Sequence, residues 1–220
     1  MVNRKVLAEV IGTFILVFCG TGAIVIDQQS PGAIGHLGIC MTFGLVVLAM
    51  VYTFGETSGA HLNPAVTIGF WVASRMPTKQ VVPYILAQFT GALLASLALK
   101  LLFPENEGLG GTNPAGAHLQ SFVLEFLLSY FLMLVIINVS QGSKEVGVLA
   151  GIAVGATVGF EALFAGPICG ASMNPARSLA PALVSGNLSA VYIYLLAPVI
   201  GMVLATLTWK AMNSPKAGAN

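Results

Sequence analysis

The chain has 220 residues, of which 56% are hydrophobic and only 8% charged; its formal net charge is +1 and its mean hydropathy is +0.89. Because soluble domains carry about 25% charged residues, this composition excludes a soluble globular protein and predicts a membrane protein. The near-neutral charge, without a basic stripe, gives no support for a nucleic-acid partner.

Six segments are long and apolar enough to cross a bilayer as helices, which takes about 20 residues. They are the segments 6–26, 35–54, 82–103, 119–140, 146–165 and 190–211. We interpret the first as a spanning helix rather than a cleaved signal, because Arg4 and Lys5 precede a long apolar run without a closing cleavage pattern. The sequence therefore predicts an all-α membrane protein with six transmembrane helices.

Two intervening segments, 55–81 and 166–189, each contain one copy of the sequence Asn-Pro-Ala. The apolar stretches that follow the copies, 66–73 and 179–184, are too short to span. Asn is a favoured N-cap and Pro is favoured at the first helical position, so each copy predicts the start of a helix. We expect two re-entrant half-helices, whose loose backbone must be covered by protein or by a water-filled cavity. The two copies are Asn63-Pro64-Ala65 and Asn174-Pro175-Ala176.

The two halves of the chain repeat each other, the first over about 6–103 and the second over about 119–211. Glu9 in the first span, for example, corresponds to Glu125 in the fourth. Because each half has three spans, the halves lie in opposite orientations, and such inverted repeats typically place the functional site at their interface near the midplane. We predict one transmembrane channel domain over residues 1–220.

The positive charges predict the topology. The loops 27–34 and 104–118 carry no Lys or Arg. Cytoplasmic loops carry an excess of Lys and Arg, so both termini are predicted to be cytoplasmic, in the plasma membrane. In the six-span arrangement, most of the positively charged residues fall on the cytoplasmic side, and only Lys100 and Arg177 do not. The residues on the cytoplasmic side are Arg4, Lys5, Arg75, Lys79, Lys144, Lys210 and Lys216.

Four ionisable residues at membrane depth require a role, because a charge there is costly. Glu9 and Glu125 could carry protons, but their repetition favours accepting hydrogen bonds from the irregular backbone of the re-entrant loops. Arg177 lies one turn into the second half-helix, where the first half has Val66. We expect it to be a fixed cation at the outer mouth, with a structural salt bridge as the alternative. Glu161 has no acidic counterpart, and no role is assigned to it.

Two facing half-helix starts predict a pore for neutral molecules. Each helix N-terminus carries about +0.5 of an elementary charge. The amide oxygens of Asn63 and Asn174 are expected to cap the helices while their N–H groups point into the lumen. Such a region repels cations and orients a water molecule so that proton hopping is interrupted.

At these residues the chain resembles the aquaporin and aquaglyceroporin (major intrinsic protein) family, and the run 170–178 is similar to the nodulin-26-like branch and its prokaryotic relatives. The resemblance implies the fold of that family and a homotetramer in the lipid bilayer, with one pore per subunit. His61 stands where the family often lines the inner pore, and bonding to a loop carbonyl is the alternative. The resemblance also implies an outer selectivity constriction, formed here by Phe43, Ala162, Ala171 and Arg177.

We therefore predict a passive channel, not an enzyme, that conducts water and small uncharged solutes such as glycerol, urea or neutral metalloid acids and excludes protons and ions. A water-selective channel is the alternative, because Ser178 stands where glycerol facilitators have Asp, although Ala162 replaces the His of strict water channels. A gradient-coupled secondary transporter is less favoured, and so is an intramembrane enzyme using Ser58 and His61. The cysteines and histidines lack metal-ligand spacing, so no metal or other cofactor is expected.

Overall fold

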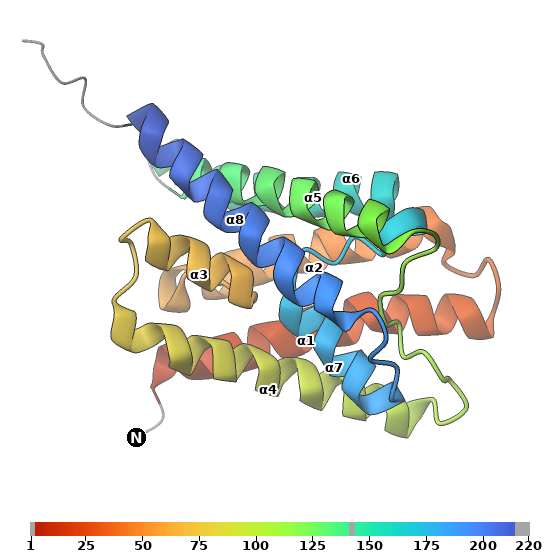
Figure 1. The fold of residues 1–220 in the computed structure, drawn as a ribbon. Coiled ribbons are helices and arrows are strands. Elements are labelled where there is room, and N and C mark those ends of the chain that lie inside the picture. Colours follow the sequence, from red (N-terminus) through yellow and green to blue (C-terminus); the bar gives the residue numbers. More distant parts are fainter. Residues whose placement is uncertain (1–2, 141–143, 214–220) are drawn as a thin grey trace, which may run out of the picture.

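The computed structural model describes residues 3–140 and 144–213, and within these ranges all of the regular structure is helical (Figure 1). Figure 1 shows the start of α1 and the end of α8 at the same end of the bundle. The helices are α1 (Arg4–Gln29), α2 (Gly35–Ser58), α3 (Pro64–Val72), α4 (Thr78–Leu102), α5 (His118–Val139), α6 (Lys144–Cys169), α7 (Pro175–Ser185) and α8 (Val191–Asn213).

Six of these helices, all but α3 and α7, are long and apolar enough to cross a membrane, and they correspond to the six predicted spans. Two of them end four residues later than predicted. The sequence predicts ends at 54 and 165, but α2 continues to Ser58 and α6 to Cys169. Each then stops at a glycine with positive φ, Gly59 at 88° and Gly170 at 86°. Glycine adopts this left-handed conformation without steric cost, so it ends each helix where the pattern of apolar residues gives no signal.

The two short helices begin at the Asn-Pro-Ala boxes, as predicted. Helix α3 has nine residues and α7 has eleven, so at about 1.5 Å per residue each reaches only partway across a bilayer of about 30 Å. In Figure 1, α3 and α7 extend from the middle of the bundle toward opposite ends, with their first turns near each other.

The packing follows the inverted repeat. Helix α1 packs against α4 as α5 packs against α8, and α2 crosses α6 between the halves. Each half-helix also contacts the last span of the other half, α3 against α8 and α7 against α4. The two repeats are therefore interlocked, and the starts of both half-helices are held from both halves.

The crossing of α2 and α6 depends on a pair of matched glycines. A Cβ atom on Gly44 would lie 2.8 Å from the carbonyl oxygen of Gly155, and one on Gly155 would lie 2.6 Å from the carbonyl oxygen of Gly44. No real Cβ approaches a backbone oxygen so closely, so only glycine permits this helix separation. Small residues serve the same purpose at helix contacts in other membrane proteins.

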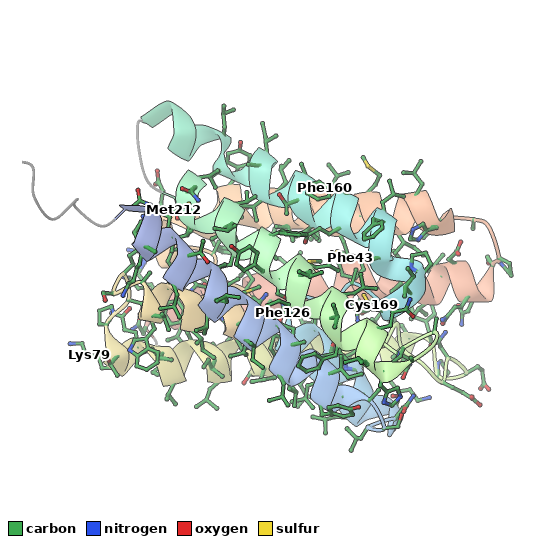
Figure 2. All side chains as sticks on the ribbon, turned by 45° about the horizontal axis from the view of Figure 1, so that its top comes forward. Phe43, Lys79, Phe126, Phe160, Cys169 and Met212 are labelled. Carbon is green, nitrogen blue, oxygen red and sulfur yellow. The ribbon has the colours of Figure 1, made fainter. Side chains whose placement is uncertain are left out.

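Polarity is distributed as a lipid environment requires. Large apolar side chains such as Phe160 and Met212 project from the outside of the bundle (Figure 2), and both are exposed. The interior instead contains fully buried polar side chains, among them Glu9, Gln88 and Glu125. Buried polar groups need hydrogen-bond partners, and the loops that precede α3 and α7 supply backbone N–H groups to the two glutamates.

Candidate functional site

Each asparagine of the boxes caps its own half-helix. The Oδ1 atom of Asn63 accepts a hydrogen bond from the backbone N–H of Ala65 at 2.9 Å. Likewise, Oδ1 of Asn174 accepts from Ala176 at 3.0 Å and from Arg177 at 3.3 Å. These bonds satisfy N–H groups that the first turn of a helix leaves without a partner.

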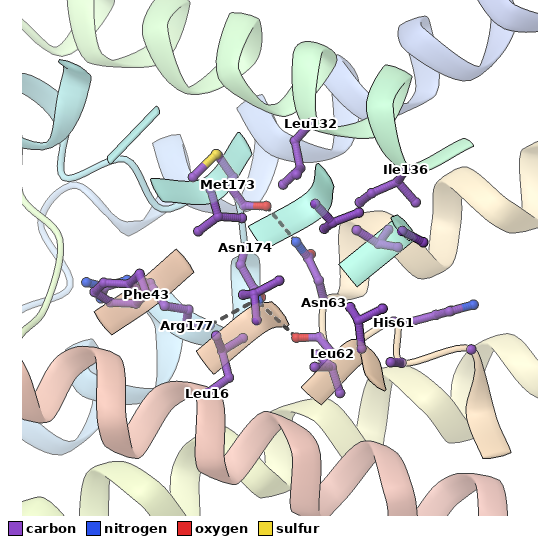
Figure 3. Close-up of a pocket in the computed structure, with 18 of the residues that line it drawn as sticks. Leu16, Phe43, His61, Leu62, Asn63, Leu132, Ile136, Met173, Asn174 and Arg177 are labelled. Atoms are coloured by element: carbon purple, nitrogen blue, oxygen red, sulfur yellow. Dashed lines mark hydrogen bonds between the residues drawn. The ribbon is translucent and has the colours of Figure 1, made fainter. Parts of the chain in front are cut away.

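The same two side chains also bind the opposite half of the chain. Nδ2 of Asn63 donates to the carbonyl oxygen of Met173 at 2.7 Å, and Nδ2 of Asn174 donates to that of Leu62 at 2.9 Å (Figure 3). The sequence did not predict these reciprocal bonds. Because an amide nitrogen carries two hydrogens, each Asn retains one N–H for the cavity that both residues line.

The residues before each box adopt an unusual backbone conformation. We name residues 59–63 the first cap loop and residues 170–174 the second cap loop. Ala60 and Leu62 have φ values of 46° and 52°, and their counterparts Ala171 and Met173 have 41° and 52°. Left-handed φ at a non-glycine residue costs about 1–3 kcal/mol and persists only where the surroundings enforce it. Both cap loops therefore need external support.

Glu9 supports the first cap loop. Its Oε1 accepts from the hydroxyl of Ser58 at 2.7 Å and from the backbone N–H of His61 at 3.0 Å. Its Oε2 accepts from the backbone N–H of Leu62 at 2.7 Å and from the amide of Gln88 at 2.8 Å. The carboxyl group thus holds two consecutive N–H groups of the strained loop.

Glu125 occupies the equivalent place at the second cap loop. Its two oxygens accept from the backbone N–H groups of Ser172 at 2.7 Å and Met173 at 2.8 Å. Both Glu125 and Glu9 are fully buried, and neither belongs to the lining of the cavity. This placement suits an acceptor for the loops and not a proton carrier along the cavity.

A cavity passes the two box asparagines and contains about 850 Å³ of empty space, which includes space open to solvent. Both cap loops and Arg177 supply most of its polar lining. The rest of the lining is apolar apart from Ser140, and along α6 the lining residues recur every four positions, at Ala150, Val154 and Val158. Such a lining provides few hydrogen-bonding positions for a permeating molecule.

Arg177 and Phe43 lie together at one end of the cavity (Figure 3). The Arg177 side chain is 3% exposed, and its Nη1 donates to the carbonyl oxygen of Gly110 at 2.8 Å. Its guanidinium carbon is 5.1 Å from the centre of the Phe43 ring. The hydrogen-bond partner is thus a backbone carbonyl, unlike the carboxylate of the alternative salt bridge, and the cation borders the cavity.

The remaining two residues of the predicted constriction differ in whether they line the cavity. Ala171 lines the cavity beside Arg177. Ala162 continues the α6 row one turn beyond Val158, but it is only 7% exposed and does not line the cavity. The structure therefore brings Phe43, Ala171 and Arg177 together and places Ala162 just outside them.

His61 lines the cavity on the other side of the boxes. Its ring stacks on Phe70 with 4.6 Å between ring centres, and its Nδ1 lies 3.1 Å from the hydroxyl oxygen of Thr67. Glu161, in contrast, does not line the cavity; it is 1% exposed, and neither carboxyl oxygen has a hydrogen-bond partner. Among the described residues, no group of His, Cys, Asp and Glu side chains comes together as a metal site.

Three contributors to the site were missed by sequence reasoning. Gln88 was visible as the one amide in the predicted span 82–103, and such a residue typically bonds inside the bundle. The other two are Gly110, whose carbonyl oxygen accepts from Arg177, and Thr112, whose hydroxyl donates to Ser178. Both lie in a polar loop without periodicity, and nothing in the sequence associates them with those partners.

Comparisons with known proteins agree with this geometry. The family model described as Major intrinsic protein matches residues 1–209. The chain is 48% identical over 218 residues to Aquaporin NIP1-2 of Oryza sativa subsp. japonica, covering 96% of this chain and 72% of that protein. It is 46% identical over 201 residues to Nodulin-26 of Glycine max, covering 91% and 74%. Its structure is similar to the X-ray structure of the aquaglyceroporin from Plasmodium falciparum, with a TM-score of 0.80, 26% identity and 94% of each chain covered.

These matches confirm the resemblance inferred from the boxes and the run that surrounds the second one. They also confirm the all-α fold with six spans, two half-helices and an inverted repeat. The relatives are aquaporins and the structural neighbour is an aquaglyceroporin, which are channels and not enzymes. This chain is an integral, multi-pass membrane protein that belongs to the major intrinsic protein family.

Proposed function

We propose that the protein is a passive channel that conducts water and small uncharged solutes and excludes protons and ions, with both repeats forming one channel domain over residues 1–220. The observation that carries this proposal is the cavity that passes between two asparagine-capped half-helix starts. The names of the relatives, aquaporins and an aquaglyceroporin, support the same class of function.

The exclusion of cations follows from the charges around the boxes. The starts of α3 and α7 each contribute about +0.5 of an elementary charge, and Arg177 adds a full positive charge at one end. The remaining N–H groups of Asn63 and Asn174 donate to the oxygen of a passing water molecule. That water then has its own hydrogens directed away from both asparagines, so it cannot relay a proton between its neighbours.

The constriction residues favour solutes somewhat larger than water. Ala171 is small, and Phe43 and Arg177 provide one apolar surface and one set of donors. A molecule such as glycerol or urea, or a neutral metalloid acid, presents hydroxyl or carbonyl oxygens to those donors without a charge that would be repelled. A strictly water-selective channel is the alternative that a solute measurement decides.

Gradient-coupled transport fits the site less well. Coupling requires ionisable groups that exchange protons or bind ions along the path. Glu9 and Glu125, the candidates from sequence, lie off the cavity and have their oxygens engaged by the cap loops. A passive mechanism needs no such group.

The proposed assembly is a homotetramer with one pore per subunit, in the plasma membrane, with both termini cytoplasmic. The exposed apolar side chains on the outside of the bundle are compatible with contact to lipid or to a second subunit. Cross-linking in native membranes, and protease access to each terminus in intact cells, test the two parts of this proposal separately.

The function is tested by stopped-flow light scattering on proteoliposomes, with water, glycerol and urea compared side by side. We expect faster shrinkage in an osmotic gradient, with a low activation energy and no saturation, and faster entry of glycerol and urea than into protein-free vesicles. Equal rates with and without protein reject a channel. Rapid water flux without solute flux favours the water-selective alternative, and saturable flux that requires a proton or sodium gradient favours a transporter.

A further inference from the structure

Each half-helix start is braced by two polar side chains at matched positions, two residues before and four residues after the box asparagine. In the first half they are His61 and Thr67, whose ring nitrogen and hydroxyl oxygen are 3.1 Å apart. In the second half they are Ser172 and Ser178, whose hydroxyl oxygens are 2.5 Å apart. The two braces correspond under the inverted repeat, although their chemistry differs.

The two braces are completed from different parts of the molecule. Gln88, inside spanning helix α4, donates to the hydroxyl oxygen of Thr67 at 2.9 Å. In the second half the third member is Thr112, which donates to Ser178 at 2.7 Å. Thr112 lies in the loop between α4 and α5, which we name the outer loop (103–117). The second brace thus depends on a loop outside the spanning helices.

The hydroxyl hydrogens of the second brace have a single consistent order. Ser172 donates its only hydroxyl hydrogen to the carbonyl oxygen of Asn174 at 3.0 Å. In the contact between Ser172 and Ser178, Ser178 must therefore be the donor, and its oxygen accepts from Thr112. The chain of bonds runs from Thr112 through both serines to the box asparagine, and hydrogen bonds in such chains strengthen one another.

The outer loop also holds the arginine of the constriction, through the bond from Arg177 to the carbonyl oxygen of Gly110. Gly110 has a φ of 65°, and a Cβ atom there would lie 2.6 Å from the carbonyl oxygen of Thr21 in α1. On the other side, a Cβ atom on Gly170 would lie 2.9 Å from the Cγ2 atom of Thr112. The segment 110–112 is therefore seated tightly between α1 and the second cap loop.

We propose that Thr112 is a positioning residue that sets the solute selectivity of the channel from the outer loop. It holds the first turn of α7 through Ser178, and two residues away Gly110 holds the guanidinium group of Arg177. Without the Thr112 hydroxyl, Ser178 loses its donor, and the first turn of α7 moves more freely against the outer loop. The opening beside Phe43 then discriminates less by size. This inference rests on the proposed channel function.

The test compares Thr112→Val, which removes the hydroxyl at nearly constant volume, with Thr112→Ser, which keeps it. Thr90→Val is the matched control, because its hydroxyl bonds only to the carbonyl oxygen of Leu86 in its own helix. For each variant, the ratio of glycerol to water permeability is measured in proteoliposomes at equal protein density. We expect the ratio to rise by about three- to tenfold in Thr112→Val, the factor that corresponds to one lost hydrogen bond. It should stay unchanged in Thr112→Ser and in the control.

A double-mutant cycle with Ser178→Ala separates positioning from general structure. If Thr112 acts through Ser178, the combined variant changes the ratio no more than the larger single variant does. If Thr112→Val does not fold, Ser178→Ala is measured in its place, and we expect the same rise in the ratio of glycerol to water permeability. A ratio that stays within about twofold of the control, or that falls, in the folded variants overturns this inference. The proposed function is tested separately, by the water, solute and proton fluxes of the unmodified protein.

Discussion

Glu9 and Glu125 hold the two cap loops by the same arrangement, and replacing them tests how much that support contributes to stability. Glutamine keeps the size of the side chain but turns one acceptor oxygen into a donor. In Glu9→Gln the hydroxyl of Ser58 and the amide of Gln88 can rotate, but the N–H groups of His61 and Leu62 cannot. Whichever way the new amide turns, one of these two buried N–H groups loses its acceptor.

A buried donor left without a partner costs about 1–3 kcal/mol. We expect this cost from Glu9→Gln and equally from Glu125→Gln, where the affected N–H group belongs to Ser172 or Met173. Leucine removes both acceptors, so Glu9→Leu and Glu125→Leu should cost about twice as much. At about 2–4 °C per kcal/mol for a chain of this size, the Gln variants should lower Tm by about 2–12 °C.

The assay is thermal unfolding of the purified protein in detergent, followed by water permeability per protein copy in proteoliposomes. Permeability should fall with stability, because the strained loops that line the cavity lose their fixed position. Glu56→Gln is the matched control, since Glu56 is exposed near the end of α2, and it should change neither quantity. Leu variants that unfold at the wild-type temperature and still conduct would refute the loop-support role. Solute flux that requires a proton gradient, and that is lost in the Gln variants, would instead identify the two acids as proton carriers.

Three further predictions concern the outer end of the channel and its surroundings. Arg177→Ala should raise urea and glycerol permeability by about ten- to hundredfold, the factor for one charge-assisted hydrogen bond, and admit small cations; unchanged permeability and conductance would remove Arg177 from the constriction. Ala162→His should reduce glycerol flux more than water flux in stopped-flow measurements, and an equal reduction of both would mean that the narrowest point lies elsewhere. Glu161→Leu should raise the Tm by about 2–12 °C, because it removes two buried oxygens without partners; a lower Tm or lost flux would show that Glu161 has a partner or a role.

The sequence was sufficient for the architecture because its strongest signals are local. Spanning helices follow from apolar length, and the starts of α3 and α7 follow from Asn before Pro, a cap whose geometry involves only neighbouring residues. The hydrogen bonds between Glu9 and a re-entrant loop could also be predicted, because irregular backbone at membrane depth needs hydrogen-bond partners.

The parts that could not be predicted are contacts between residues far apart in the chain. The bond between Asn63 and the carbonyl oxygen of Met173 spans 110 residues, and the bond between Arg177 and Gly110 spans 67. No sequence pattern around these residues indicates which residue each of them binds. Ala162 is a different case. Its spacing from Arg177 identified it as a candidate for the constriction, but the spacing does not show whether its side chain lines the cavity.

The proposed function requires that the two half-helix starts border a path that water can follow and protons cannot. It is tested most directly by measuring both fluxes in the same proteoliposomes, with light scattering for water and a trapped pH-sensitive dye for protons. We expect water permeability to rise in proportion to protein density while proton permeability stays at the level of protein-free vesicles. Proton flux that rises together with water flux would contradict it.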